Sequence, residues 1–333
     1  MSKIVVLGAS GHIGGYLVPR LVEAGHEVVA VSRGRSAPYR PHAAWDAVER
    51  VVLDRDAAEA DGTFGATIAG LRPDVVVDLI CFTVDSAQAL VDALRGSGAL
   101  LVHCGTVWVH GPSEVVPLTE ADPRRPFGEY GTQKAAIERL LQEESRRPGG
   151  LRSVVLHPGH ITGPGWAMIG PQGNLDLQVW RDLLSGRPVT LPGLGLETLH
   201  HVHADDVAQA FQLAVERQDQ VVGESFFVVS ERAVTLRGLA EGVARRHGLQ
   251  ADLRFVPWEE FRASTTEEHH DASWQHASRS HSMSIDKARR LLGYAPRWST
   301  LDAVVEGLDA LRADGTLVVD ERVDEQAGEA ARP

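Results

Sequence analysis

The chain opens with an apolar run that leads directly into a glycine-rich turn. Lys3–Leu7 is followed by Gly8-Ala9-Ser10-Gly11-His12-Ile13-Gly14. This order predicts a strand, a tight turn and then a helix from about Gly11 to Ala24, with apolar residues at helical spacing. In such a turn, bare backbone N–H groups and the positive end of the helix dipole can meet the pyrophosphate of a dinucleotide. The start of the chain therefore predicts a dinucleotide-binding strand–turn–helix unit.

A second feature lies further along the chain, where Tyr130 and Lys134 stand four positions apart. Residues at this spacing lie on one face of a helix. Tyrosine has an ordinary pKa of about 10, and a nearby ammonium stabilises its phenolate form. Either feature alone is weak evidence, because glycine turns recur by chance in a chain with 33 glycines. Together they predict a phenol that transfers protons beside a bound dinucleotide.

Strand-like and helix-like segments alternate through the first half of the chain. Several of the strands, such as Val75-Val76-Val77, are apolar without alternation, as expected when both faces of a parallel sheet are covered. This pattern predicts an α/β fold with a doubly wound parallel sheet, the Rossmann architecture. After the first strand, further strands are expected at Glu27–Val31, Val48–Leu53, Asp74–Leu79, Ala99–His103 and Arg152–Leu156, and a long helix carrying Tyr130 is expected to end at about Glu144.

The regular alternation of strands and helices ends at about Gly159, where glycine and proline cluster and the elements become shorter. We expect residues 1–158 to form the dinucleotide-binding Rossmann core. Residues 159–319 are expected to be mostly a smaller α+β substrate-binding lobe, with 200–230 returning to the core. The acidic tail 320–333 has few aromatic residues and is expected to be disordered.

Composition excludes some partners. The net charge of the 333 residues is −12, which argues against electrostatic capture of nucleic acid or of an anionic membrane. No apolar run reaches the roughly 18–20 residues that span a bilayer, and Lys3 is followed at once by a strand instead of a signal peptide. Cys81 and Cys104 lie in apolar runs and are expected to be reduced thiols. A cytoplasmic location is predicted.

Four blocks together carry a family resemblance. The chain resembles the extended short-chain dehydrogenases/reductases, the NAD(P)-dependent epimerase/dehydratase group. That resemblance implies that Tyr130 exchanges a proton with a substrate hydroxyl or carbonyl, that Thr106 holds the same oxygen, and that Lys134 hydrogen-bonds the nicotinamide ribose. The blocks are Gly8–Gly14, Gly105–Gly111, Tyr130–Lys134 and His201–Ala208.

The resemblance also implies a set of cofactor-binding residues. At the end of the second strand the chain has Ser32 and Arg33 in place of the acid that holds the ribose hydroxyls of NAD. An arginine suits the 2′-phosphate of NADP, so NADP is favoured over NAD. The cofactor-binding residues are predicted to be Gly8, Ser10, Gly11, His12, Ile13, Gly14, Ser32, Arg33, Arg35, Asp54, Leu79, Ile80, Cys81, Cys104, Tyr130, Lys134, Pro158 and His160.

Two departures from the family pattern concern the substrate. Nucleotide-sugar enzymes of this family generally carry an arginine where this chain has Leu199, and Arg279 is only a loose candidate for a second one. Without such a clamp, a diphosphate should bind weakly. We therefore predict hydride exchange at a secondary alcohol or ketone carbon of a sugar-like or other small polar substrate. The candidate substrate residues are Phe82, Thr106, Val107, Trp108 and His160.

Two alternative functions stay open. One is a nucleotide-sugar 4-epimerase, which Leu199 disfavours. The other is a non-catalytic relative that senses nucleotide or binds RNA, because Trp180–Gly193 is similar to chloroplast stem-loop RNA-binding proteins of this superfamily. The Tyr130/Lys134 pair and the acidic net charge weigh against it.

Three further expectations concern metal, a loop and assembly. Histidines are dense at His200, His201, His203, His269, His270, His276 and His281, but no spacing matches a metal-ligand pattern, so no metal site is predicted. The polar stretch Thr265–Ser282 is expected to be a mobile loop over the substrate cleft. A homodimer is expected through the helix that carries Tyr130, on the apolar run Ala135, Ala136, Ile137, Leu140 and Leu141.

Overall fold

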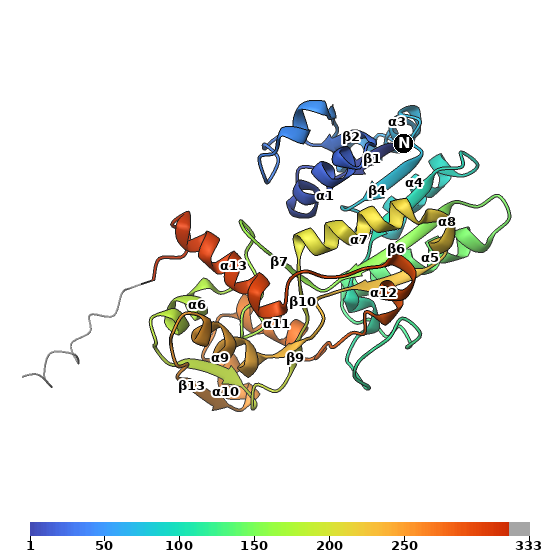
Figure 1. The fold of residues 1–333 in the computed structure, drawn as a ribbon. Helices are drawn as coiled ribbons and strands as arrows, with labels where there is room; N and C mark the ends of the chain where they lie inside the picture. Colours follow the sequence, from blue (N-terminus) through green and yellow to red (C-terminus); the bar gives the residue numbers. More distant parts are fainter. Residues whose placement is uncertain (320–333) are drawn as a thin grey trace, which may run out of the picture.

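A central sheet of seven parallel strands organises the protein, as seen in a computed structural model that describes residues 1–319 (Figure 1). The strand order β11-β6-β5-β4-β1-β2-β3 confirms the doubly wound sheet that the sequence predicts. Register places Ile4 of β1 opposite Val28 on one side and Val75 on the other. The strands are β1 (Lys3–Leu7), β2 (Glu27–Ser32), β3 (Glu49–Val52), β4 (Val75–Asp78), β5 (Leu100–Cys104), β6 (Arg152–Pro158) and β11 (Ser225–Val228).

Two hydrophobic cores cover the two faces of this sheet. Ile4 and Val6 belong to one core with α1 (His12–Glu23) and α7 (Ala204–Glu216), whereas Val5 and Leu7 belong to the other. Successive side chains of a strand point to opposite faces, so a strand buried on both faces must be apolar throughout. The second core contains residues of α2 (Arg55–Ala60), α3 (Phe64–Gly70), α4 (Val84–Leu94) and α5 (Glu129–Arg146).

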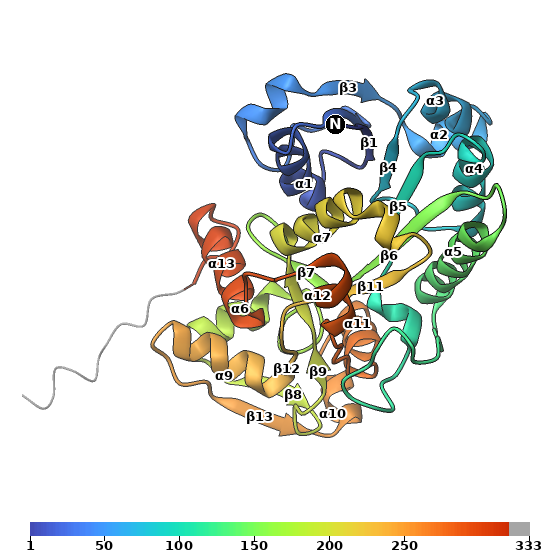
Figure 2. The same ribbon diagram turned by 45° about the vertical axis from the view of Figure 1, so that its right-hand side comes forward.

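A third core lies outside the sheet and joins shorter elements of the second half of the chain. Its elements α6 (Leu177–Leu184), α9 (Leu236–Arg246) and β13 (Leu253–Val256) gather at the end of the molecule away from α3 and α4 (Figures 1 and 2). Three two-stranded sheets belong to this half: β7 (His160–Thr162) with β10 (His201–His203), β8 (Val189–Pro192) with β13 (Leu253–Val256), and β9 (Thr198–Leu199) with β12 (Val234–Thr235). The remaining helices are η1 (Ala43–Ala47), η2 (Val107–His110), α6 (Leu177–Leu184), α8 (Gln218–Val221), α9 (Leu236–Arg246), α10 (Trp258–Ala263), α11 (Glu267–Ala277), α12 (Asp286–Leu292) and α13 (Thr300–Ala313).

The chain crosses between these parts more than once. Strand β11, within the segment 200–230, pairs with β6 in the central sheet. The division into domains at residue 158 stays a prediction. The predicted disordered tail, 320–333, lies outside the described residues. Within residues 1–319, no helix has both the length and the apolar character needed to cross a bilayer.

The expectation of a loop at Thr265–Ser282 is wrong, because most of this stretch forms α11. Thr266 caps the helix by accepting from the backbone N–H of His269, and the buried Ser273 hydroxyl donates to the His269 carbonyl. These polar side chains thus take part in the hydrogen bonding of a helix, although their composition is typical of a loop.

The apolar run on α5 is largely used inside the protein. Ile137 and Leu141 are fully buried in the second core. They are not available to a second copy of the chain, so the predicted homodimer would need other residues of this helix. It stays a prediction.

Candidate functional site

A cavity of about 480 Å³ opens at the carboxyl ends of the central strands, where ligands bind in open α/β sheets. The residues that follow β1, β4, β5 and β6 all contribute to its wall. The fold thus brings together segments that are far apart in the sequence. Of the residues predicted from the sequence, the cavity is lined by Gly8, Gly11, His12, Ile13, Gly14, Leu79, Ile80, Phe82, Cys104, Thr106, Trp108, Tyr130, Lys134, Pro158 and His160.

The glycine turn has the geometry that a dinucleotide requires. Gly8 has a φ of +82°, which side chains rarely adopt. A Cβ on Gly14 would lie 2.2 Å from the Ala9 carbonyl oxygen, so α1 can pack this closely only with glycine there. The first N–H groups of a helix have no intrahelical partner, and Gly11 at the cap position of α1 offers them no side chain. The turn therefore fits the pyrophosphate of NAD or NADP.

Aromatic rings cover the start of α1. The His12 ring stacks on Trp166 at 5.0 Å between centroids and 5° between planes, and Tyr39 lies 5.2 Å from His12. Burial lowers the pKa of His12 to about 3, so this imidazole is neutral at pH 7. Trp166 was not predicted, because it lies in a glycine- and proline-rich segment without a periodic pattern.

Tyr130 lies at the start of α5 and lines the cavity with Thr106. Burial raises the pKa of the Tyr130 phenol to about 12, while a side-chain hydrogen bond with Thr106 acts in the opposite direction. Thr106 follows β5 and caps η2, where its hydroxyl accepts from the backbone N–H of Trp108 at 3.3 Å. The two hydroxyls are therefore close enough to hold one oxygen atom between them.

Lys134 is almost fully buried one helical turn after Tyr130. Its ammonium donates to the Cys81 carbonyl at 2.7 Å and to the Cys104 carbonyl at 2.5 Å, and it lies 5.9 Å from the centre of the Tyr130 ring. Burial lowers the pKa of Lys134. In this structure Lys134 thus ties α5 to the ends of β4 and β5. The lowering of the Tyr130 pKa by this ammonium stays a prediction.

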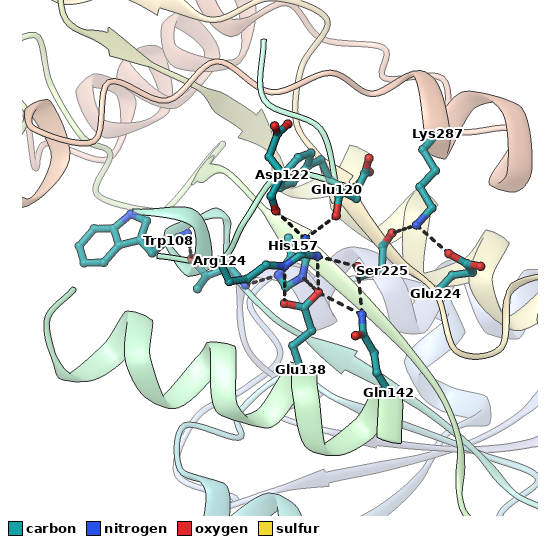
Figure 3. Close-up of polar contacts among 12 residues, drawn as sticks. Trp108, Glu120, Asp122, Arg124, Glu138, Gln142, His157, Glu224, Ser225 and Lys287 are labelled. Atoms are coloured by element: carbon teal, nitrogen blue, oxygen red, sulfur yellow. Dashed lines mark hydrogen bonds and ion pairs between the residues drawn. The ribbon is translucent and has the colours of Figure 1, made fainter. Parts of the chain in front are cut away.

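A largely buried polar network of Arg124, Glu138 and His157 (Figure 3) reaches the backbone of Thr106. The backbone N–H of Thr106 donates to His157 Nδ1 at 3.0 Å, and His157 Nε2 lies 3.1 Å from Glu138 Oε1. Arg124 donates to both carboxylate oxygens of Glu138, at 2.7 and 3.1 Å. Burial alone would raise the pKa of Glu138, but His157 and Arg124 together hold it well below its usual range. Sequence reasoning missed Glu138 and Arg124, although Glu138 follows Lys134 by one helical turn.

Several predicted residues do not line the cavity. Val107 and Cys81 are buried beneath it. At the end of β2, the Ser32 hydroxyl accepts from Gly34, and Arg35 forms a 3.1 Å ion pair with Asp54. The predicted residues outside the cavity wall are Ser10, Ser32, Arg33, Arg35, Asp54, Cys81 and Val107.

Other lining residues have no counterpart in the sequence analysis. Their rings and aliphatic groups come from the chain after β6. A motif search finds none of them, because apolar residues in an irregular segment carry no pattern. They are Ile161, Trp166, Ala167, Ile169 and Leu175; His276 of α11 also lines the cavity, and the sequence analysis named it among the dense histidines but not as a site residue.

One cluster in the described part of the chain has metal-ligand proximity, and it is not among the dense histidines. Ligand atoms of Asp78, Cys81 and His103 lie within 4.8 Å of one another. Arg55 donates to both carboxylate oxygens of Asp78 at 2.9 Å, so a cation already occupies this carboxylate. The cluster is a buried ion pair with polar neighbours.

Comparison with known proteins gives a consistent picture. The model of the NAD dependent epimerase/dehydratase family matches residues 4–229. The chain is 28% identical to 2'-dehydrokanamycin reductase of Streptomyces kanamyceticus, over 77% of this chain and 70% of that one. It is 23% identical to the chloroplast stem-loop binding protein of 41 kDa b from Arabidopsis thaliana, over 94% of this chain and 80% of that one. The crystal structure of a UDP-glucose 4-epimerase from Thermotoga maritima with UDP-glucose superposes with a TM-score of 0.72 at 20% identity, covering 94% of this chain and 99% of that one.

Proposed function

The chain belongs to the NAD dependent epimerase/dehydratase family, and we propose that it is an NAD(P)-dependent enzyme that exchanges hydride at a secondary alcohol or ketone carbon. The observation that carries this proposal is a single cavity that contains the glycine turn, Thr106, Tyr130 and Lys134. A surface helix would not bring a buried ammonium, a phenol and a strand-end hydroxyl to the carboxyl edge of the sheet. The extended short-chain dehydrogenase/reductase resemblance of the sequence points to the same activity.

Each of the three residues has a task that follows from its chemistry. A bound nicotinamide would supply or accept the hydride. Tyr130 gives a proton to the substrate oxygen during reduction and takes it back during oxidation. Thr106 hydrogen-bonds the same oxygen and fixes the reacting carbon. Lys134 holds the two strand-end carbonyls that shape the wall beside Tyr130, and its ammonium favours the phenolate form.

We propose NADP as the preferred cofactor. The end of β2 has Ser32 and the exposed Arg33 where an acid would hold the ribose hydroxyls of NAD. Arg35 stands nearby but is paired with Asp54. A 2′-phosphate would add negative charge at this end of the site, next to two guanidinium groups.

Reduction of a ketone is the direction that the curated relative of Streptomyces kanamyceticus supports, since its name is that of a reductase. A nucleotide-sugar 4-epimerase stays an alternative that Leu199 disfavours, because this residue is fully buried where the expected arginine would bind diphosphate.

An RNA-binding role is supported by the relative of Arabidopsis thaliana but opposed by the net charge of −12. A cytoplasmic location and a homodimer stay predictions.

The test follows the absorbance of reduced nicotinamide with NADPH and with NADH against a panel of ketones and sugars. We expect Tyr130→Phe to lower turnover by roughly 10²–10⁴-fold, because it removes the proton donor, while the affinity for cofactor stays the same. Tyr294→Phe is the control, since it removes a phenol that does not line the cavity and that donates to the Val229 carbonyl. Full activity in Tyr130→Phe would overturn the proposal.

A further inference from the structure

We propose that the substrate is a neutral, largely apolar ketone that carries an aromatic or alicyclic ring, or the corresponding secondary alcohol, and not a nucleotide sugar. This inference rests on the proposed function and names its substrate class. It departs from the sugar-like or small polar substrate that the sequence favours. The argument comes from the walls of the cavity, from its charges and from one histidine.

Aromatic rings flank the phenol that would transfer the proton. Trp108 meets Tyr130 edge to face at 5.6 Å between centroids, and Phe82 lies 6.4 Å from Tyr130. Both rings line the cavity, and Phe82 is 52% exposed. A substrate whose reacting oxygen touches Tyr130 must therefore place its neighbouring atoms against these rings. Flat or alicyclic rings fill such a space with favourable contacts.

The lining that comes from the chain after β6 is also apolar, and part of it, Trp166, stacks on His12 beside the glycine turn. Trp166, Ala167, Ile169 and Leu175 belong to this lining. Trp166 and Leu175 are 44% and 49% exposed, respectively, although both are large apolar side chains. Apolar surface of this kind, gathered in a concave site, is typical of a place where an apolar ligand is buried.

The cavity offers little charge to an ionic substrate. Among the described residues that line it, Lys134 is the one whose side chain is charged at neutral pH, and its ammonium already binds two carbonyls. Burial lowers the pKa of His276 to about 4 and that of His160 well below its ordinary value, so both imidazoles are neutral. The cofactor's own pyrophosphate would use the N–H groups of the glycine turn, so a substrate diphosphate would need cationic partners elsewhere in the cavity, and an aminoglycoside would need carboxylates. Neither kind of partner is offered by this wall within residues 1–319.

Arg279, the loose candidate for a phosphate clamp, does something else. It is fully buried, and its guanidinium lies 3.8 Å from the Trp108 ring centre and 3.7 Å from that of Phe127. It also donates to the Phe127 carbonyl at 2.9 Å. Arg279 is thus committed to the support of Trp108, and it does not line the cavity. The arginine stabilises an aromatic wall by a cation–π contact.

His160 adds a requirement for one more neutral oxygen. The residue is 8% exposed, and neither ring nitrogen has a hydrogen-bond partner among the residues that the structure describes. A neutral imidazole has one donor and one acceptor, and a buried polar group without a partner is costly. A hydroxyl or second carbonyl beside the reacting carbon would satisfy His160. The ring ketone that we propose therefore carries such an oxygen.

The test compares benzoin, which has a hydroxyl beside its ketone, with deoxybenzoin, which lacks it, and with UDP-glucose. Binding is measured by thermal unfolding of the full chain with saturating oxidised cofactor, and turnover by the absorbance of reduced nicotinamide. We expect both aromatic ketones to raise the unfolding temperature and UDP-glucose not to do so. We expect kcat/KM for benzoin to exceed that for deoxybenzoin, and His160→Phe to remove about a tenfold advantage, the worth of one hydrogen bond.

A matched pair of variants checks the wall itself. Leu175→Asp should lower kcat/KM for both ketones by about tenfold or more, because it places a charge against apolar ligand. Leu194→Asp should change neither value, since Leu194 is also exposed but does not line the cavity. Equal effects of the two variants would overturn the assignment of this wall.

The outcomes separate the substrate class from the activity. Hydride exchange with UDP-glucose, with no binding of either ketone, would overturn the substrate class and leave the proposed function intact. Absence of any ketone-dependent shift in unfolding temperature overturns the substrate class whatever the turnover shows. Failure to bind either cofactor would overturn the proposed function as well.

Discussion

The two sides of Thr106 are built from opposite kinds of side chain. Behind it lie the buried Glu138 and His157 and the partly buried Arg124, which are joined by short polar contacts (Figure 3). In front of it lies the cavity, with aromatic rings and neutral histidines. A buried charge is tolerated only where a partner neutralises it, so the charged side is complete in itself. The difference shows that polar and charged groups hold the backbone of Thr106 from one side, while the wall on the other side is largely apolar.

The largest expected effect comes from removing a charge behind Thr106. Glu138→Ala leaves the buried His157 and the partly buried Arg124 without their common carboxylate, and it should lower the free energy of unfolding by about 3 kcal/mol. Chemical denaturation measures this loss. Glu143→Ala is the control on the same helix, because Glu143 is exposed, and it should change stability by about 0.5 kcal/mol or less. Equal losses in the two variants would show that the network is not a distinct support.

The two sides of Thr106 should also contribute to the free energy of unfolding in different pH ranges. Burial lowers the pKa of His276 to about 4, below its ordinary value of 6.5, so the unfolded chain binds more protons than the folded chain between these values. Stability therefore falls as pH falls from 6.5. The slope is about 1.4 kcal/mol per pH unit for each such histidine. Glu138 acts in the opposite range, because its folded pKa is depressed. Its contribution is present above its unfolded pKa and is lost only below about pH 4.

Denaturation at pH 7 and at pH 5 tests this separation. His276→Phe should lose about 2 kcal/mol less than the unmodified chain over this interval, since one histidine no longer takes up a proton. Glu138→Ala should keep the original difference between the two pH values. If Glu138→Ala instead reduced the stability difference between pH 7 and pH 5, the group that takes up the proton would belong to the polar network behind Thr106. That result would contradict the assignment of this pH dependence to His276.

The sequence predicted the strands and glycine turn that form the base of the site better than the aromatic and apolar wall of the cavity. The strand at Lys3–Leu7 was predicted with the bounds that the structure has, because apolar strands and glycine turns have fixed local patterns. The front wall depends on tertiary packing. Trp166 comes from an irregular segment and His276 from α11. The stretch Thr265–Ser282 was expected over the substrate cleft, although as a loop, but no local pattern marked His276 or Trp166 as a lining residue, because a contact between distant segments is not encoded in local periodicity.

Polar composition was misleading for the same reason. The stretch Thr265–Ser282 contains many residues that favour loops when they are solvated. In the structure, the Asn174 amide donates to the Ser273 hydroxyl at 3.0 Å, and Arg279 is enclosed by aromatic rings. Each partner lies far away in the sequence. Burial of polar groups can be recognised only when those partners are known.

The smallest expected effect concerns the proposed site for the 2′-phosphate at the end of β2, where charged side chains are again found. Arg33 is exposed at the end of β2, while Arg35 is already paired with Asp54 at 3.1 Å. Arg33→Ala should therefore raise KM for NADPH by about tenfold, as expected for the loss of one charge-assisted contact to a phosphate. KM for NADH and for the ketone should stay unchanged, because neither molecule places a phosphate there.

Arg254→Ala is the matched control, since Arg254 is an exposed arginine on β13. Steady-state kinetics with both cofactors distinguish the two ends of the site. A change in KM for the ketone alone would mean that Arg33 serves the substrate, and the contrast between a charged cofactor end and an uncharged substrate end would fail. A rise in KM for NADPH alone would show that the charged cofactor end and the uncharged substrate end of the site are distinct. Phosphate recognition would then lie at the end of β2, away from the apolar wall in front of Tyr130.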